Sequence, residues 1–186
     1  MLPLPATPWR IAITDPTRRG WLERARELLR DDAVEFLQLR AHELQPDVFA
    51  AAATDLAQIA AQRLILNGPE PLARRLGVHI HLRATSARCP SGLRVFQACH
   101  TSDDVRRAAA RGAHAALLAP VFAPRSKPND GRPTLGLRQL RAICAASPIP
   151  VLALGGIDAV RHDECVANGA AGTAGMHRYF GDLPQR

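Results

Sequence analysis

Polar side chains follow several of the predicted strands, where they could act on a small ligand. His100 ends the run Gln97-Ala98-Cys99-His100. An imidazole titrates near neutral pH and can both take and return a proton, so His100 is the candidate general acid/base. A histidine just before a helix can equally be a capping or packing residue.

A second polar group lies in the run Gln38-Leu39-Arg40-Ala41-His42. Alternate residues of a strand share one face, so Gln38, Arg40 and His42 would present an amide, a guanidinium and an imidazole together. If that face is buried in a binding site, the three side chains suit a polar ligand. The alternative is an ordinary surface strand end.

Glycine-rich turns follow two late strands and predict a phosphate site. One is Gly155-Gly156, and the other runs over Gly172, Thr173, Ala174 and Gly175. Backbone N–H groups in such turns can face an anion, and glycine lets the ligand approach closely. Two tight turns that simply need glycine are the alternative.

A long loop, Pro120–Gly131, is rich in proline and glycine and contains Ser126 and Lys127. Lys127 is the only lysine of the chain, since arginine supplies every other basic side chain. We expect this loop to cover an anionic group as a lid, with Ser126 and Lys127 contacting the ligand.

No metal site is expected from the residue spacing alone. His79 and His81 alternate on one predicted strand, but no acidic third ligand lies near them. The four cysteines, Cys89, Cys99, Cys144 and Cys165, include no Cys-x-x-Cys pair. We expect reduced thiols and no cofactor.

The elements that position these groups alternate between strand and helix. Helical spacing of apolar residues and N-cap signals predict helices at 18–30, 46–62, 101–111, 135–146 and 158–168, with short segments at 69–76 and 83–90. Eight strands are predicted at 9–14, 34–40, 64–67, 78–82, 93–99, 115–121, 150–154 and 171–176. This repeat predicts a single compact α/β domain over 1–186, a (β/α)₈ TIM barrel. An open doubly wound sheet is the alternative.

The chain is short for such a barrel. It has 186 residues, of which ten follow Met176, so the eighth helix must be short or missing. We expect the N-terminal segment, or a second copy of the chain in a homodimer, to cover the flank that is left.

The composition excludes several classes of partner. The formal net charge is +7, but the arginines are dispersed and aromatic residues make up only 4%. We therefore expect no nucleic-acid binding. No apolar run approaches a membrane span, and the first residues lack a basic signal region, so we expect a cytoplasmic protein without a membrane partner.

These segments, read in order, resemble the thiamin phosphate synthase/TenI family. The matching runs are Gln-Leu-Arg at 38–40, Leu-Ile-Leu-Asn at 64–67, Ile-His-Leu at 80–82, Ala-Cys-His-Thr at 98–101, Pro-Val-Phe at 120–122 with Ser-Lys at 126–127, Pro-Val-Leu-Ala-Leu-Gly-Gly-Ile at 150–157, and Asn-Gly-Ala-Ala-Gly-Thr-Ala at 168–174. The chain also resembles the synthase-like domain fused to Nudix hydrolases. The resemblance implies a barrel of thiamin biosynthesis whose small-molecule ligand is a thiazole phosphate.

The chain departs from the synthase pattern at the residues that hold the substrate and Mg²⁺. His42 replaces the lysine of Gln-x-Arg-x-Lys, Asn67 is followed by Gly68 instead of aspartate, and the stretch Arg83-Ala84-Thr85-Ser86 lacks the second carboxylate. Magnesium held by carboxylates neutralises a departing pyrophosphate, so these changes weaken the synthase expectation. Mg²⁺ is expected only if the chain is nevertheless a synthase.

Three hypotheses remain. The first is a TenI-like thiazole tautomerase, in which His100 moves a proton without a metal. The second is a divergent synthase that joins an aminopyrimidine pyrophosphate to a thiazole phosphate. The third is a protein that binds a thiazole or thiamin phosphate without catalysis.

Overall fold

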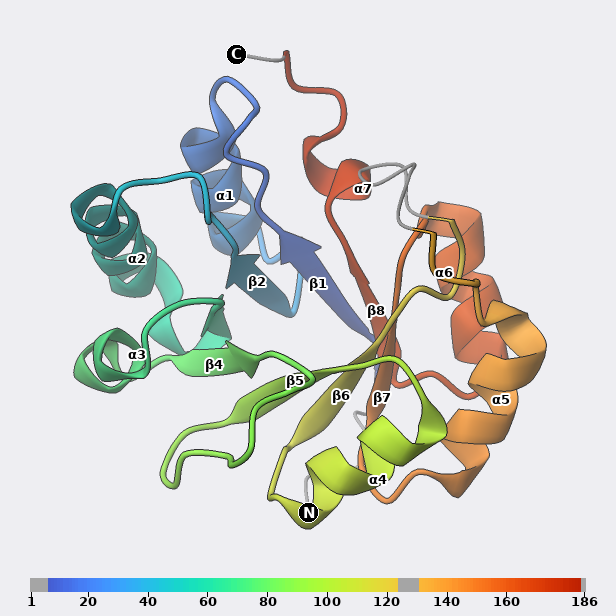
Figure 1. Ribbon diagram of the computed structural model, residues 1–186. Helices are drawn as coiled ribbons and strands as arrows, with labels where there is room; N and C mark the ends of the chain where they lie inside the picture. Colours follow the sequence, from blue (N-terminus) through green and yellow to red (C-terminus); the bar gives the residue numbers. More distant parts are fainter. Residues whose placement is uncertain (1–6, 124–130, 185–186) are drawn as a thin grey trace.

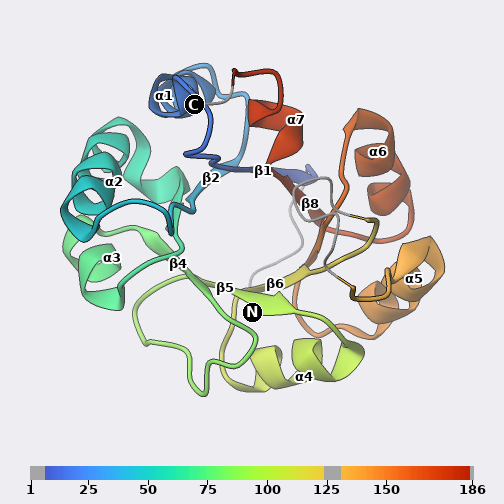
Figure 2. The same ribbon diagram turned by 45° about the horizontal axis from the view of Figure 1, so that its top comes forward.

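Eight parallel strands close into a barrel, with helices outside it (Figures 1 and 2). The computed structural model describes residues 7–123 and 131–184. The strands are β1 (Trp9–Ile13), β2 (Phe36–Leu39), β3 (Leu64–Leu66), β4 (His79–Leu82), β5 (Val95–Cys99), β6 (Ala115–Leu118), β7 (Val151–Leu154) and β8 (Gly172–Gly175). The TIM barrel prediction is therefore confirmed, since β1 pairs with both β2 and β8.

The helices follow the strands in the order expected from the sequence. They are α1 (Trp21–Arg30), α2 (Pro46–Ala60), α3 (Glu70–Leu76), α4 (Ser102–Ala110), α5 (Gly136–Ala146), α6 (Ala159–Ala167) and α7 (His177–Phe180), and the 3₁₀ turn η1 (Ala61–Arg63) follows α2. Among the described residues no helix has the length and apolar composition needed to cross a membrane.

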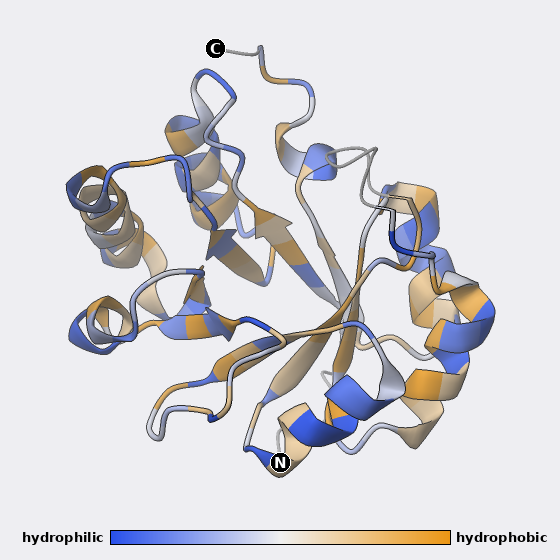
Figure 3. Ribbon diagram, viewed as in Figure 1, coloured by the Kyte–Doolittle hydropathy of each residue, from blue (hydrophilic) through white to orange (hydrophobic). Residues whose placement is uncertain are grey.

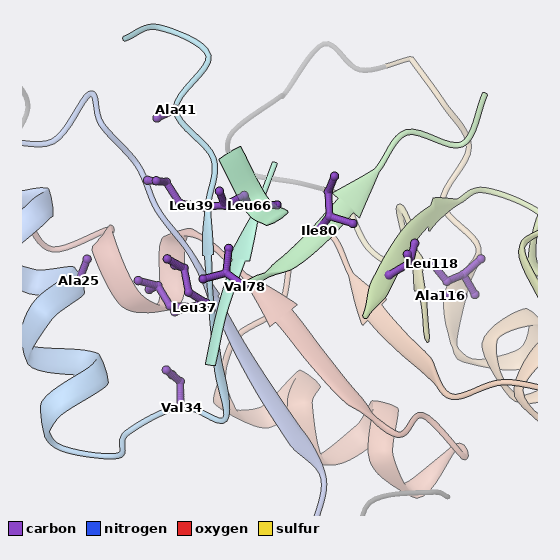
Figure 4. Packing of buried hydrophobic residues seen from close by; sticks show 14 of the residues in the cluster. Ala25, Val34, Leu37, Leu39, Ala41, Leu66, Val78, Ile80, Ala116 and Leu118 are labelled. Carbon is purple, nitrogen blue, oxygen red and sulfur yellow. The ribbon is translucent and has the colours of Figure 1, made fainter. Parts of the chain in front are cut away.

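Two layers of apolar side chains hold the barrel, one inside it and one between strands and helices. Successive strand residues point to opposite sides, so Leu37 and Leu39 face the helices while Gln38 faces inward. Figure 4 shows Leu37, Leu39 and Leu66 on the outer side. The helices turn their apolar sides to this layer, and their polar residues lie outside (Figure 3).

The amino-terminal end of the barrel is filled by aromatic rings. Phe36 makes edge contacts with Trp9 at 5.4 Å and with Phe96 at 5.3 Å between ring centroids. His79 packs beside Phe36, and its Nε2 lies 2.8 Å from the carbonyl oxygen of Gln62. His79 is thus a partnered core residue far along the strand from any site at the opposite end.

A loop stands where the fourth outer helix of a regular barrel would be. Residues 83–94 form no helix, and Figure 2 shows this loop between α3 and α4. Gln97 Nε2 donates to the carbonyl oxygen of Arg83 at 3.3 Å, and Arg111 Nη1 donates to that of Ser86 at 2.9 Å. These bonds fix the loop against its neighbours.

The eighth helix is a single turn, as its short sequence predicts, and residues 1–6 of the N-terminal segment expected to cover its flank lie outside the described residues. Phe180 of α7 is fully buried in the outer layer. The segment after it turns back onto the loop before α1, where Arg18 Nη1 donates to the carbonyl of Leu183 at 3.0 Å and the Arg19 amide to that of Pro184 at 2.8 Å. In the described part of the chain, its own last residues provide this cover, and the homodimer stays a prediction.

Candidate active site

A cavity of about 650 Å³ opens at the carboxyl ends of the strands. This is the end of a TIM barrel at which active sites form. Seven of the residues predicted from the sequence line it: Gln38, Arg40, Asn67, Gly155, Gly156, Ala174 and Gly175. These seven residues thus lie together around one cavity, and their roles in binding stay a prediction.

The glycine pair after β7 lies close to the loop that follows β6. A Cβ atom on Gly155 would lie 3.0 Å from the carbonyl oxygen of Phe122, and one on Gly156 would lie 2.6 Å from that of Ala123. Both glycines also have positive φ angles, 103° and 62°. Glycine is required at both positions by this close packing, and both residues line the cavity.

The amino terminus of α6 faces the same edge of the cavity. Asp158 caps the helix, because its Oδ1 accepts from the Arg161 amide at 3.0 Å. Arg161 reaches back to the carbonyl of Gly156 at 2.6 Å and lies 4.6 Å over the Phe122 ring. Glycine amides and a helix N-terminus together suit a phosphate group.

Two of the residues predicted for this edge lie elsewhere. Gly172 begins β8 at the far end of the barrel, where a side chain would collide with the backbone of Trp9. Thr173 faces outward, and its Oγ1 lies 2.8 Å from Nδ1 of His162 on α6. Because a strand rises about 3.3 Å per residue and alternates its faces, only its last residues reach the cavity. Gly172 and Thr173 thus hold the barrel closed and do not line the site.

His100 is held rigidly at the end of β5. Its amide donates to Asp104 Oδ2 at 2.9 Å, and Asp104 forms a capping box with Thr101 at the start of α4. Its Nδ1 lies 2.7 Å from the carbonyl oxygen of Ala119. Since a carbonyl only accepts, Nδ1 carries the hydrogen and Nε2 keeps a lone pair. Nε2 is thus the acceptor atom of the ring, and Arg132 Nη1 lies 3.3 Å from it.

Arg132 lies beside His100, a contact that sequence reasoning missed. Its Nη1 is 3.0 Å from Nδ1 and 3.3 Å from Nε2 of the ring. Arg132 lines the cavity, and His100 itself does not. No sequence signal marked Arg132, because 32 residues separate it from His100.

The ends of β2 and β4 bring buried polar atoms to the cavity. Within residues 7–123 and 131–184, Gln38 Oε1 and both ring nitrogens of His81 are buried and make no hydrogen bond. Burial lowers the pKa of His81 to about 4, with smaller contributions from His42 and Arg40, so the ring is neutral near pH 7. Arg40 lies 3.9 Å from Glu43, and His42 is exposed outside the cavity lining. His81 is a site residue that the sequence analysis considered only as a metal ligand.

The end of β3 does not fit a magnesium ion. A Cβ atom at Gly68 would lie 2.6 Å from Cζ of Phe49, whose ring on α2 fills that space. The described residues contain no cluster of three or more His, Cys, Asp or Glu side chains suited to a metal. The residues present thus do not form the carboxylate site that Mg²⁺ prefers. Asn67 still lines the cavity, whereas Ser126 and Lys127 lie outside the described residues.

The closed eight-stranded barrel, with a cavity at the carboxyl ends of its strands, defines a TIM-barrel protein. Residues 11–178 match the sequence profile described as thiamine monophosphate synthase (TMP-TENI). The chain belongs to this family, which is a family of thiamine biosynthesis.

The known relatives agree with this assignment. A putative thiamine-phosphate synthase of Geobacter sulfurreducens is 32% identical over 82% of this chain and 76% of its own length. Putative thiamine-phosphate synthase 2 of Aquifex aeolicus is 28% identical over 91% and 96%. The match to the thiamine-phosphate synthase of Methanoculleus marisnigri is 42% identical but spans only 41% of this chain and 36% of that protein.

A solved structure shows the same fold. The thiamine phosphate pyrophosphorylase of Pyrococcus furiosus superposes with a TM-score of 0.78 at 20% identity, over 91% of this chain and 85% of that one.

Proposed function

We propose that this chain binds a thiazole phosphate in the cavity and rearranges the ring by a proton shift that needs no metal. The Phe49 ring beside Gly68 carries this proposal, because it fills the space where a metal carboxylate of a synthase would stand. The glycine edge that suits the phosphate is retained. The substrate class is therefore a thiazole phosphate carboxylate tautomer, as in TenI-like proteins.

His100 is the acid/base in this proposal. With Nδ1 donating to Ala119, Nε2 takes a proton from one carbon of the substrate and returns it to another. One C–H bond breaks and one forms, and the ring becomes aromatic. This proton shift needs no oxidant, leaving group or metal.

The second candidate function is thiamin phosphate synthesis, which the names of the relatives favour. It requires the charge of a departing pyrophosphate to be neutralised. Of the cavity residues, Arg40, Arg132 and Arg178 are cations that could contribute to this charge balance. A protein that only binds the ligand is the remaining alternative.

Two assays of the purified chain separate these functions. The first supplies the carboxylated thiazole tautomer in the presence of EDTA, and we expect conversion to the aromatic isomer. The second supplies thiazole phosphate, aminopyrimidine pyrophosphate and Mg²⁺, and we expect no thiamin phosphate. Thiamin phosphate formed at an enzymatic rate would overturn the proposal, and ligand binding without turnover in either assay would support the binder.

Replacing His100 with alanine is expected to lower the tautomerisation rate by about 10²- to 10⁴-fold, since a positioned general acid/base contributes that much. The affinity for thiazole phosphate should stay within a few-fold, because the phosphate is held at the glycine edge in this proposal. His162→Ala is the control, as His162 lies behind β8 against Thr173. Undiminished turnover in His100→Ala would refute the assignment.

A further inference from the structure

Arg132 lines the cavity and contacts the His100 ring, with Nη1 3.0 Å from Nδ1 and 3.3 Å from Nε2. Its guanidinium carries only donors and stays charged at every physiological pH, so it can neither accept nor relay the proton that His100 moves. A permanent cation beside a base is instead suited to hold an anionic part of the ligand next to that base.

The cavity offers a separate place for the phosphate group. Gly155, Gly156 and Gly175 line it after β7 and β8, whereas Arg132 precedes α5 and meets His100 of β5. A ligand with two anionic groups can therefore be held at two points, one at the glycine edge and one at Arg132. A ligand with a phosphate alone uses only the first.

We propose that Arg132 binds the carboxylate of the substrate beside His100 and selects carboxylated thiazole phosphates over the same ester without the carboxylate. This rests on the proposed function for the reaction, while the selection itself is a property of binding. The planar guanidinium matches a carboxylate with two parallel N–H donors.

Binding of the substrate carboxylate by Arg132 also accelerates the proposed proton transfer. When a base removes a proton from the ring carbon that bears the carboxylate, negative charge spreads onto the carboxylate oxygens. A fixed cation at that position stabilises this charge more in the transition state than in the ground state, which accelerates the step. Arg132 thus acts on both selection and rate.

The test compares two probes by calorimetry: the aromatic thiazole phosphate carboxylate and thiazole phosphate. The wild-type chain should bind the carboxylated probe more tightly. Arg132→Ala should lower the affinity for that probe by about 10-fold or more, the range for a charge-assisted hydrogen bond. The affinity for thiazole phosphate should fall by less than about 3-fold. Arg132→Lys, which keeps the charge but loses the planar fork, should recover part of the difference.

Arg138→Ala is the matched control, since Arg138 is exposed on α5 and outside the cavity lining. Equal loss for both probes in Arg132→Ala, or no loss for either, would overturn the proposal for Arg132. If the wild type and Arg138→Ala discriminate between the probes but show no turnover of the tautomer, the proposed reaction fails and the carboxylate site stands. Turnover without discrimination between the probes would reject the carboxylate site alone.

Discussion

The glycines that follow β7 and the glycine that follows β3 differ in how they relate to the cavity. At the β7–β8 edge, Gly155 and Gly156 line the cavity, and the loop after β6 fills the space that their Cβ atoms would take. At the β3 end, the space beside Gly68 is already filled by Phe49. In both places neighbouring atoms fill the Cβ position, so the comparison teaches that a glycine in a βα turn indicates a ligand site only where its backbone lines the cavity.

The two edges also differ in charge. The β7–β8 edge has backbone amides and the α6 N-terminus, which suit a phosphate. Near the β3 and β4 ends, the cavity receives the uncharged groups Asn67, Gln38 and neutral His81. The two sides of the cavity thus differ in the polar groups that they present, as the proposed binding of a phosphate at the glycine edge requires.

The largest effect is expected when Gly68, at the β3 end, is substituted. An aspartate there must displace the Phe49 ring, so Gly68→Asp should lower the free energy of unfolding by about 1–3 kcal/mol, the range for overpacking. In a Phe49→Leu background the same change should cost less, because the shorter side chain leaves room. Urea unfolding of the four proteins of this cycle measures the coupling, and an equal cost in both backgrounds would contradict the packing described.

A smaller effect is expected at Gly156. Alanine there takes a left-handed backbone at about 1–2 kcal/mol and presses on the carbonyl of Ala123, which should weaken thiazole phosphate binding by about 10-fold. Gly77→Ala is the matched control for Gly156→Ala, because Gly77 has a φ of 64° and no atom lies within 4 Å of the added Cβ. Gly77→Ala should lose stability but keep its affinity. Unchanged affinity in Gly156→Ala, measured by calorimetry, would remove the phosphate from this edge.

The smallest effect is expected when the pH is lowered, and it concerns the two histidines of β4. The pKa of His81 is lowered to about 4 by burial, and that of His79 is lowered by burial as well. Both histidines bind protons more readily when unfolded, so the stability they confer is complete above about pH 6.5 and falls as the pH drops toward their folded pKa values. From pH 7 to pH 6, His81 should account for a loss of under about 1 kcal/mol in the free energy of unfolding.

Urea midpoints at pH 7, 6 and 5 measure this slope, and His81→Asn should flatten it. A slope that His81→Asn leaves unchanged would show that this ring is not the buried neutral group described.

The barrel and the glycine edge were predictable because both follow from local patterns. Strand spacing, the N-cap residues Thr101 and Asp158, and glycines directly after a strand are visible within short segments. The same locality explains why Gln38 and Arg40 were assigned to one face and do line the cavity.

The remaining features depend on which residues distant segments bring together. Phe49 precedes Gly68 by a whole helix, and Arg132 meets His100 across β6, so neither contact has a local signal. Gly172 and Thr173 were placed at the cavity because the sequence shows a strand but not how far along it the mouth begins. His81 was undervalued because alternation alone does not separate a core histidine from one at the mouth.

The pairing of β1 with β8 has a consequence for the order of folding. Trp9 lies against Gly172 in this pair, so the first strand finds one of its two neighbours only in the last. As the chain leaves the ribosome, β1 and the strands after it can pair in succession, but the ring stays open with two exposed edges until β8 arrives. The nascent chain is thus most prone to aggregation before β8 is available to pair with β1 and β7.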